Sequence, residues 1–173
     1  WGIQAAQEQG LIRGPRIWIA GRALSQTGGH GDFRMRTQAH PEPCGCSSGA
    51  ALTSRLADGI SAVRQAAREE LRQGANQIKA MVSGGVASPY DPIANVQYSE
   101  EELRAIFEEA EHWKTYVMAH AYTAEAITHA INCGVRTIKH ANLIDLKTAH
   151  LATSKRAYIV PTLITYFAME ENG

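Results

Sequence analysis

The chain has 173 residues, 45% of them apolar, and is therefore long enough to bury the hydrophobic core of one globular domain. Its 17 Lys and Arg residues balance 17 Asp and Glu residues, and this zero net charge excludes the basic surface typical of nucleic-acid or anionic-membrane binders. No apolar run approaches the length of a transmembrane helix.

Short apolar runs recur along the chain and predict the strands of a parallel sheet that is covered on both faces. In chain order they are residues 16–21, 76–85, 115–122, 135–142 and 157–165. Helical patterns fill the gaps between them, and this alternation of strand and helix predicts an α/β fold. About five strands in a chain of this length fit either most of an eight-stranded barrel or an open doubly wound sheet.

Capping residues mark the expected helix boundaries. Four residues that can cap a helix N-terminus each precede a helical pattern: Asp58, Ser99, Thr123 and Asp145. Glu102 follows Ser99 at the spacing of a capping box. Gly74 and Gly134 follow two of the predicted helices as C-terminal stops.

Two connections are longer than a parallel α/β fold requires. Residues 22–56 follow the first predicted strand, and residues 84–98 follow the second. Both leave the C-terminal ends of strands, which is the face where such folds build their sites. Long loops at that face are often functional, so we expect both to contribute to a site.

The cysteines Cys44, Cys46 and Cys133 do not suit a disulfide framework, because their number is odd and only two lie close together. A reducing compartment, the cytoplasm, is therefore the expected location. The chain begins at Trp1, so a signal peptide would not be visible. Cys44 and Cys46 lack the second pair or histidine motif that a soft-metal site needs, and we interpret them as free thiols in a loop.

Lys79 lies in a predicted strand with apolar neighbours, and two interpretations stay open. At a strand end or edge, the ammonium would reach water along its own stem. If the side chain is buried instead, desolvation lowers its pKa. The neutral amine can then add carbon dioxide to give a carbamate, an anionic ligand that can bridge two metal ions.

His120 and His140 favour the second interpretation. They lie in the next two predicted strands, and in a parallel sheet those positions would be neighbours of Lys79. A single histidine in an apolar strand is usually a core residue, whereas two at matching positions beside a lysine predict a metal site. Imidazole is the commonest protein ligand for zinc-like metals, and a metal pair both polarises a carbonyl and activates water as hydroxide.

Several stretches together resemble the amidohydrolase superfamily, in particular its prolidase-like and imidazolonepropionase-like branch: GPRIWIAGRALSQTGGHGD, QIKAMVSGGVASP, VMAHAYT, TIKHANLID and YIVPTLITY. The resemblance implies a partial (β/α)8 barrel with one or two divalent metal ions, zinc being the expected metal. It implies that Lys79 is carboxylated and that His120 and His140 are metal ligands. It also implies that His30 and Tyr122 face the carboxyl or carbonyl group of the substrate.

Parts of the family pattern have no counterpart here. The chain contains neither the His-x-His pair of the first barrel strand nor the metal-binding Asp of the eighth, the expected general base. By this resemblance, residues 1–173 are the central part of the catalytic barrel, with the N-terminal strands and the C-terminal strand absent. Lys139 also stands before His140, where relatives often carry an acidic residue.

The resemblance implies a metal-dependent amidohydrolase that cleaves amide or peptide C–N bonds by metal-activated hydroxide. Expected substrates are small dipeptides such as Xaa-Pro or N-acyl amino acids, with no nucleic-acid or membrane partner. Alone, the 173 residues are expected to be inactive and to self-associate, because five strands cannot close a barrel. Two alternatives stay open: a non-catalytic α/β binding module, although no phosphate-loop motif is present, and an inactive truncated relative.

Overall fold

The computed structural model describes residues 1–37, 53–86, 88 and 90–172, so Cys44 and Cys46 lie outside the described residues. The strands are β1 (Ala23–Ser25), β2 (Ser54–Leu56), β3 (Ile78–Met81), β4 (Val117–Thr123), β5 (Thr137–Leu143) and β6 (Tyr158–Val160). The helices are α1 (Gly2–Glu8), α2 (Ile60–Arg72), α3 (Glu100–His112), α4 (Ala124–Asn132), α5 (Leu146–Ser154) and α6 (Leu163–Asn172).

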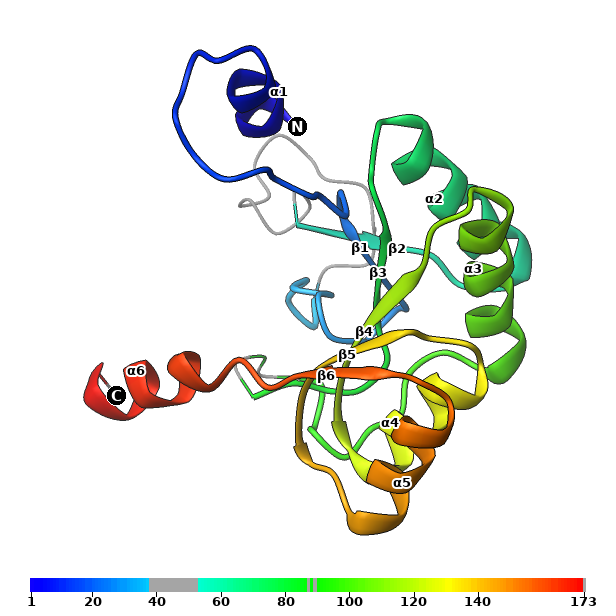
Figure 1. The fold of residues 1–173 in the computed structure, drawn as a ribbon. Helices are drawn as coiled ribbons and strands as arrows, with labels where there is room; N and C mark the ends of the chain where they lie inside the picture. The colour runs from blue at the N-terminus through cyan, green and yellow to red at the C-terminus, as the bar shows by residue number, and fades with distance from the viewer. Residues whose placement is uncertain (38–52, 87, 89, 173) are drawn as a thin grey trace.

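The strands form one six-stranded sheet in the order β2-β1-β3-β4-β5-β6, and every pair of neighbours is parallel. Helices α2, α3, α4 and α5 all cover the same face of this sheet, whereas α1 and α6 extend away from it (Figure 1). The expected α/β architecture with a parallel sheet is confirmed. The opposite face of the sheet carries no such layer of helices among the described residues.

Alternation along the strands divides the side chains between the two faces. One set packs into the hydrophobic core against the helices: Ile78 and Ala80 of β3, Val117, Ala119 and Ala121 of β4, and Ile138 of β5. Val63 of α2, Ile106 of α3 and Ile127 of α4 meet them and are wholly buried. The residues between these positions, including Lys79 and His120, therefore lie on the face away from the helices.

Most of the predicted helix boundaries are confirmed. Ser99 and Glu102 form the expected capping box at α3, and the Thr123 and Asp145 side chains accept from backbone amides at the starts of α4 and α5. Asp58 is wrong as an N-cap, because α2 is capped by Gly59 without a side-chain hydrogen bond. The Asp58 carboxylate accepts instead from the backbone amide and hydroxyl of Thr27.

The first predicted strand is wrong in position. Residues 16–21 are not a strand, and β1 begins only at Ala23. Gly21 has φ +66° and interrupts the extended run, and a Cβ at Gly21 would lie 2.3 Å from Oε2 of Glu70. That oxygen accepts from the Arg22 amide at 2.9 Å, so the buried Glu70 carboxylate fixes the turn before β1.

Two further boundaries differ from the prediction. β2 lies inside the segment 22–56 that the sequence indicates as a loop. It pairs with β1, a non-local contact that a three-residue polar strand does not reveal. The predicted strand 157–165 is β6 only at its start, because Pro161 cannot donate to a ladder and α6 begins at Leu163.

Candidate metal centre

His120 lies on β4, on the sheet face away from the helices, and is 3% exposed. Its Nε2 is 3.0 Å from the carbonyl oxygen of Gly84. Because a carbonyl oxygen can only accept, Nε2 carries the proton, and Nδ1 of the neutral ring keeps a free lone pair. Burial is the main cause that lowers the pKa of His120 to about 3, so the ring is neutral near pH 7.

His140 lies on the adjacent strand β5, where Ala121 of β4 pairs with it. Its Nδ1 is 2.7 Å from the hydroxyl oxygen of Thr162, which leaves Nε2 as the second ring nitrogen. Burial first, and then the charge of Lys79, lower the pKa of His140 to about 4. Each histidine thus has one ring nitrogen held by a protein oxygen, which is how metal-ligating imidazoles are commonly oriented.

The backbone at His140 is strained. His140 and the following Ala141 have φ of 73° and 54°, in the left-handed region that residues other than glycine rarely adopt. Thr162, the partner of the His140 ring, has φ 50°. The β4–β5 pairing shifts register between Ala121 and Thr123, beside this strained segment. Strain of this kind persists only where the surroundings enforce it, and it concentrates at functional sites.

Lys79 is half-buried on β3 and shares its sheet face with His120. Burial, and then the charge of Lys139, lower the pKa of the Lys79 amine to about 8. The charge of Lys79 in turn contributes to the lowered pKa of both His120 and His140, so the three groups share one electrostatic environment. The lysine side chain is therefore not a strand-edge residue reaching freely into water.

His30 and Tyr122 join the two histidines in one group of rings. The His30 ring stacks on His120 with centroids 4.2 Å apart, and the Tyr122 ring stacks on His140 at 4.9 Å. His120 also makes edge contacts with Tyr122 at 5.0 Å and with His140 at 4.8 Å. The structure therefore brings His30, Tyr122, His120 and His140 together, although they come from the loop after β1, from β4 and from β5.

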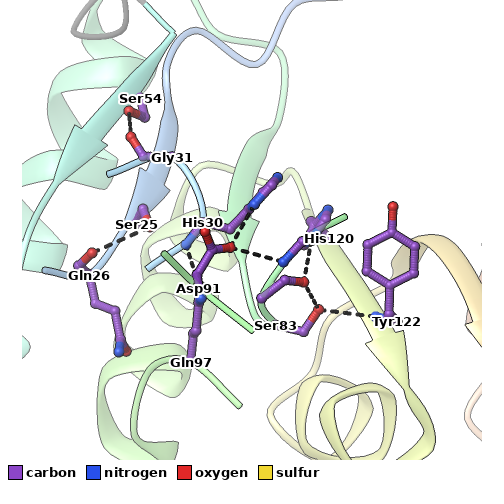
Figure 2. A network of polar contacts seen from close by, with 12 residues as sticks. Ser25, Gln26, His30, Gly31, Ser54, Ser83, Asp91, Gln97, His120 and Tyr122 are labelled. Atoms are coloured by element: carbon purple, nitrogen blue, oxygen red, sulfur yellow. Dashed lines mark hydrogen bonds and ion pairs between the residues drawn. The ribbon is translucent and has the colours of Figure 1, made fainter. Parts of the chain in front are cut away.

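Polar contacts hold this group of rings to the segment that follows β3 (Figure 2). The Ser83 hydroxyl accepts from the Tyr122 amide at 3.1 Å and donates to the Gly84 carbonyl, which His120 also contacts. Nδ1 of His30 lies 2.9 Å from a carboxylate oxygen of Asp91. Neither Ser83 nor Asp91 is conspicuous in the sequence, because a serine after a strand and an aspartate between Tyr90 and Pro92 are ordinary turn residues.

The donor groups around His120 and His140 fit a metal ion only on one condition. Among the described residues, no group of three or more His, Cys, Asp or Glu side chains is arranged to hold one. Two neutral imidazoles, each with one ring nitrogen left over, nevertheless suit zinc, and a carboxylate-type oxygen is one of the ligands that can complete such a set. Lys79 can provide such an oxygen only after conversion to a carbamate, and on that condition the residues fit a metal.

The fold and these side chains define a class: a parallel α/β protein whose candidate site lies beside the loops that follow the strands. The chain belongs to the amidohydrolase family, whose family model matches residues 2–171. The expectation drawn from the motifs is thereby confirmed at the level of the family.

Solved structures support the same assignment. A prolidase solved in complex with N-methylphosphonate-L-proline is 57% identical to this chain, with a TM-score of 0.93, and the match covers 100% of this chain and 42% of that one. A Xaa-Pro dipeptidase with methionine bound in its active site is 32% identical, with a TM-score of 0.79, over 93% of this chain and 38% of that one. The fold is therefore part of a (β/α)8 barrel, as predicted, with six strands described and not five.

A curated relative with a different named activity also matches. Ochratoxinase of Aspergillus niger is 35% identical over 169 residues, which are 92% of this chain and 35% of the relative. Its crystal structure has a TM-score of 0.84 to this chain. The chain thus spans about a third of the length of this curated relative. None of the described helices combines the length and the apolar character that crossing a bilayer requires.

Proposed function

We propose that the intact protein is a metal-dependent amidohydrolase that cleaves the amide or peptide C–N bond of small substrates. The observation that carries this proposal is the gathering of His120 and His140, both with lowered pKa, on the sheet face that holds Lys79. The likeness to a prolidase, a Xaa-Pro dipeptidase and ochratoxinase supports amide hydrolysis as the reaction class.

In this proposal Lys79, His120 and His140 hold the metal. The imidazoles bind through the ring nitrogens that the Gly84 carbonyl and the Thr162 hydroxyl leave free. The neutral amine of Lys79 forms a bond to the carbon of CO2 and loses a proton, which gives an anionic carbamate. A bound divalent ion, zinc being the expected one, would polarise the scissile carbonyl and lower the pKa of a water molecule.

The carbamate would also remove the electrostatic repulsion between Lys79 and a divalent cation. Lys79 and Lys139 are close enough for their charges to interact, and two neutral imidazoles adjoin them. A divalent cation entering this group with both lysines protonated would be repelled. Conversion of the Lys79 ammonium to a carbamate replaces a positive charge by a negative one at the position where the cation has to bind.

His30 and Tyr122 are proposed to orient the substrate. Both rings adjoin the two histidine ligands. The Tyr122 phenol can donate to a carboxyl or carbonyl oxygen, and the His30 ring nitrogen that does not face Asp91 can accept from an N–H of the substrate. Such groups suit an Xaa-Pro dipeptide or an N-acyl amino acid, in which an N–H, the scissile carbonyl and the carboxylate are close together. No general base is assigned within this chain; that role is proposed for an aspartate of the intact protein outside residues 1–173.

The proposal is tested on Lys79→Ala in the full-length protein. We expect the variant to lose its bound metal, measured by elemental analysis, together with hydrolysis of Xaa-Pro dipeptides. Added short carboxylic acids should restore part of the activity, because they supply the oxygen ligand that the carbamate provided. A carbamate signal should appear in the 13C NMR spectrum of the wild-type protein under 13CO2 and be absent from the variant.

Lys139→Met is the matched control, because it removes the neighbouring ammonium from the same environment. This control should retain its metal and its carbamate signal. Full activity of Lys79→Ala without added acid, or equal metal loss in both variants, would contradict the assignment of Lys79 as a ligand.

A further inference from the structure

Asp91 is a buried carboxylate that no part of the proposed reaction has yet used. It is 2% exposed and lies in the segment between β3 and α3. Its Oδ2 accepts from the Gly85 amide at 2.9 Å and lies 2.9 Å from Nδ1 of His30. Its other oxygen, Oδ1, is buried without a hydrogen-bond partner among the described residues.

This arrangement is costly for a structural role alone. A buried carboxylate with an unpaired oxygen destabilises a fold, and its presence therefore calls for a role that offsets this cost. A neutral asparagine could accept the Gly85 and His30 hydrogen bonds with less desolvation. The carboxylate differs from the amide in that both of its oxygens can only accept hydrogen bonds. It therefore cannot rotate to present a donor to the histidine ring, as an amide can.

The loop after β1, which carries His30, packs closely against the segment after β3, which carries Asp91. A Cβ at Gly85 would lie 2.1 Å from Cε1 of His30, so only glycine lets the imidazole pack against this backbone. A Cβ at Gly84 would lie 1.9 Å from the carbonyl oxygen of Pro92, next to Asp91. The Gln97 side chain accepts from the His30 amide at 3.0 Å and holds the backbone of the same residue.

The contact determines which nitrogen of His30 carries the proton. Since the Asp91 carboxylate only accepts, Nδ1 of His30 must be the donor, and Nε2 of the neutral ring is then left as an acceptor. Among the residues that the structure describes, none forms a hydrogen bond to this Nε2, while the ring itself stacks on His120. Figure 2 shows Asp91 between the His30 loop and the strand end that leads to Ser83.

We propose that Asp91 is a positioning residue, which fixes the rotamer and the Nδ1–H tautomer of His30 so that Nε2 is presented to the substrate beside the metal ligands. Its consequence for catalysis rests on the proposed function. The tautomer itself does not, because it follows from the Asp91, Gly85 and His30 contacts alone.

The test uses the full-length metal-loaded protein labelled with 15N-histidine. Long-range 1H–15N NMR spectra report the tautomer of His30, whose signals are assigned by their loss in His30→Gln. We expect the Nδ1–H form in the wild type and a shift towards the Nε2–H form in Asp91→Ala. Asp91→Asn should keep more of the Nδ1–H form than Asp91→Ala but less than the wild type, because its amide oxygen can still accept while its amide NH2 can also turn towards the ring.

Activity provides the second measurement. Asp91→Ala should lower kcat/KM for Xaa-Pro dipeptides by roughly tenfold or more, as misplacement of a substrate-orienting group does, with the metal content unchanged. In a chain that already carries His30→Gln, Asp91→Ala should lower kcat/KM much less than it does in the wild type. The reason is that a residue acting through His30 has no effect once the imidazole is gone.

Asp58→Ala is the matched control. Asp58 anchors the same loop through Thr27 but does not contact His30, so its loss should leave both the tautomer and kcat/KM unchanged. An unaltered His30 tautomer in Asp91→Ala, or an equal effect of Asp58→Ala, would overturn the inference. If the wild type hydrolyses no dipeptide, the proposed function fails, and the NMR comparison still decides the role of Asp91.

Discussion

Tyr122 contributes to the candidate site in two separate ways, through its ring and through its hydroxyl. Its ring stacks on His140 and meets the edge of His120, while its hydroxyl accepts from the Tyr166 hydroxyl at 3.0 Å. Burial raises the pKa of the Tyr122 phenol, so the hydroxyl remains protonated and can donate near neutral pH. The ring thus packs beside the proposed ligands, and the hydroxyl is available for a substrate oxygen.

We predict that Tyr122→Phe in the full-length protein keeps its metal but loses substrate affinity. The phenylalanine ring preserves the stacking, while the lost hydrogen bond to a charged substrate group is worth about 1.5–3 kcal/mol, or roughly tenfold or more in kcat/KM. Steady-state kinetics and elemental analysis measure the two effects. Tyr116→Phe, just before the start of β4, is the control that should change neither. Metal loss in Tyr122→Phe would show that the tyrosine is structural.

At the residue scale, the sequence alone identified polar residues that alternate with apolar ones along a strand. Lys79 and His120 stand out because a polar residue among apolar neighbours is conspicuous, and the period of two places both on one face. Asp91 gives no such signal. Its proposed role depends on its contact with His30, which lies 61 positions away in the sequence, and only the folded chain brings the two loops together. Thr162 and Tyr166 were missed for the same reason, since they reach His140 and Tyr122 only through the folded chain.

At the scale of elements, helices α2 and α3 are joined by one buried carboxylate. Glu109 of α3 is 3% exposed and accepts from Arg64 at 2.9 Å and from Arg68 at 2.8 and 2.9 Å. The hydrogen bond from Arg68 is the main cause that lowers the pKa of Glu109. A lowered carboxyl pKa means that this group stabilises the fold above its unfolded-state pKa and ceases to do so as the pH falls.

We predict that Glu109→Gln destabilises the full-length protein at pH 7 and that this difference from the wild type shrinks below pH 4.5, the ordinary value of the group. The reason is that acid protonates the wild-type carboxylate and removes its advantage over the amide. Urea unfolding at several pH values measures the difference. Glu111→Gln, at an exposed position on the same helix, should show little effect. A difference that grows as the pH falls would contradict this account.

The segment after β3 depends on a glycine for its close backbone contact. The Gly84 position leaves no room for a Cβ, because the nearest atoms belong to the backbone of Asp91 and Pro92 and cannot rotate away. We predict that Gly84→Ala costs about 1–3 kcal/mol of unfolding free energy, as overpacking usually does, and also lowers dipeptide hydrolysis. Gly14→Ala, where a Cβ meets nothing within 4 Å, should do neither. Unfolding and activity of the two variants provide the comparison.

Helix boundaries were predictable because their signals are local. The capping box of Ser99 and Glu102, and the caps Thr123 and Asp145, depend only on residues within three positions. Strand positions were less predictable, since an apolar run does not say where pairing begins. The run at 16–21 is held instead by Asn76, whose side chain accepts from the Ile19 amide at 2.8 Å.

At the scale of the whole molecule, one group of exposed apolar side chains lies at the β6 end of the sheet. Strand β6 pairs only with β5 among the described residues, and its three side chains are all exposed. Helix α6 follows and has no buried residue. It adds further exposed apolar side chains, among them Leu163, Ile164, Phe167 and Met169. An unpaired strand next to exposed apolar side chains is a surface that associates readily.

This surface leads to the prediction that residues 1–173, expressed alone, self-associate and turn over no dipeptide. The chain corresponds to 42% of the prolidase structure, and a barrel removes its sheet edges only by closing. Light scattering should therefore show particles larger than the 18.8 kDa monomer, and assays with added zinc should show no Xaa-Pro hydrolysis. A matched chain with Ile164→Lys and Phe167→Glu should associate less, because charges on α6 oppose apolar contact. An active monomer would contradict both the role of this surface and the assignment of the general base to a residue outside the chain.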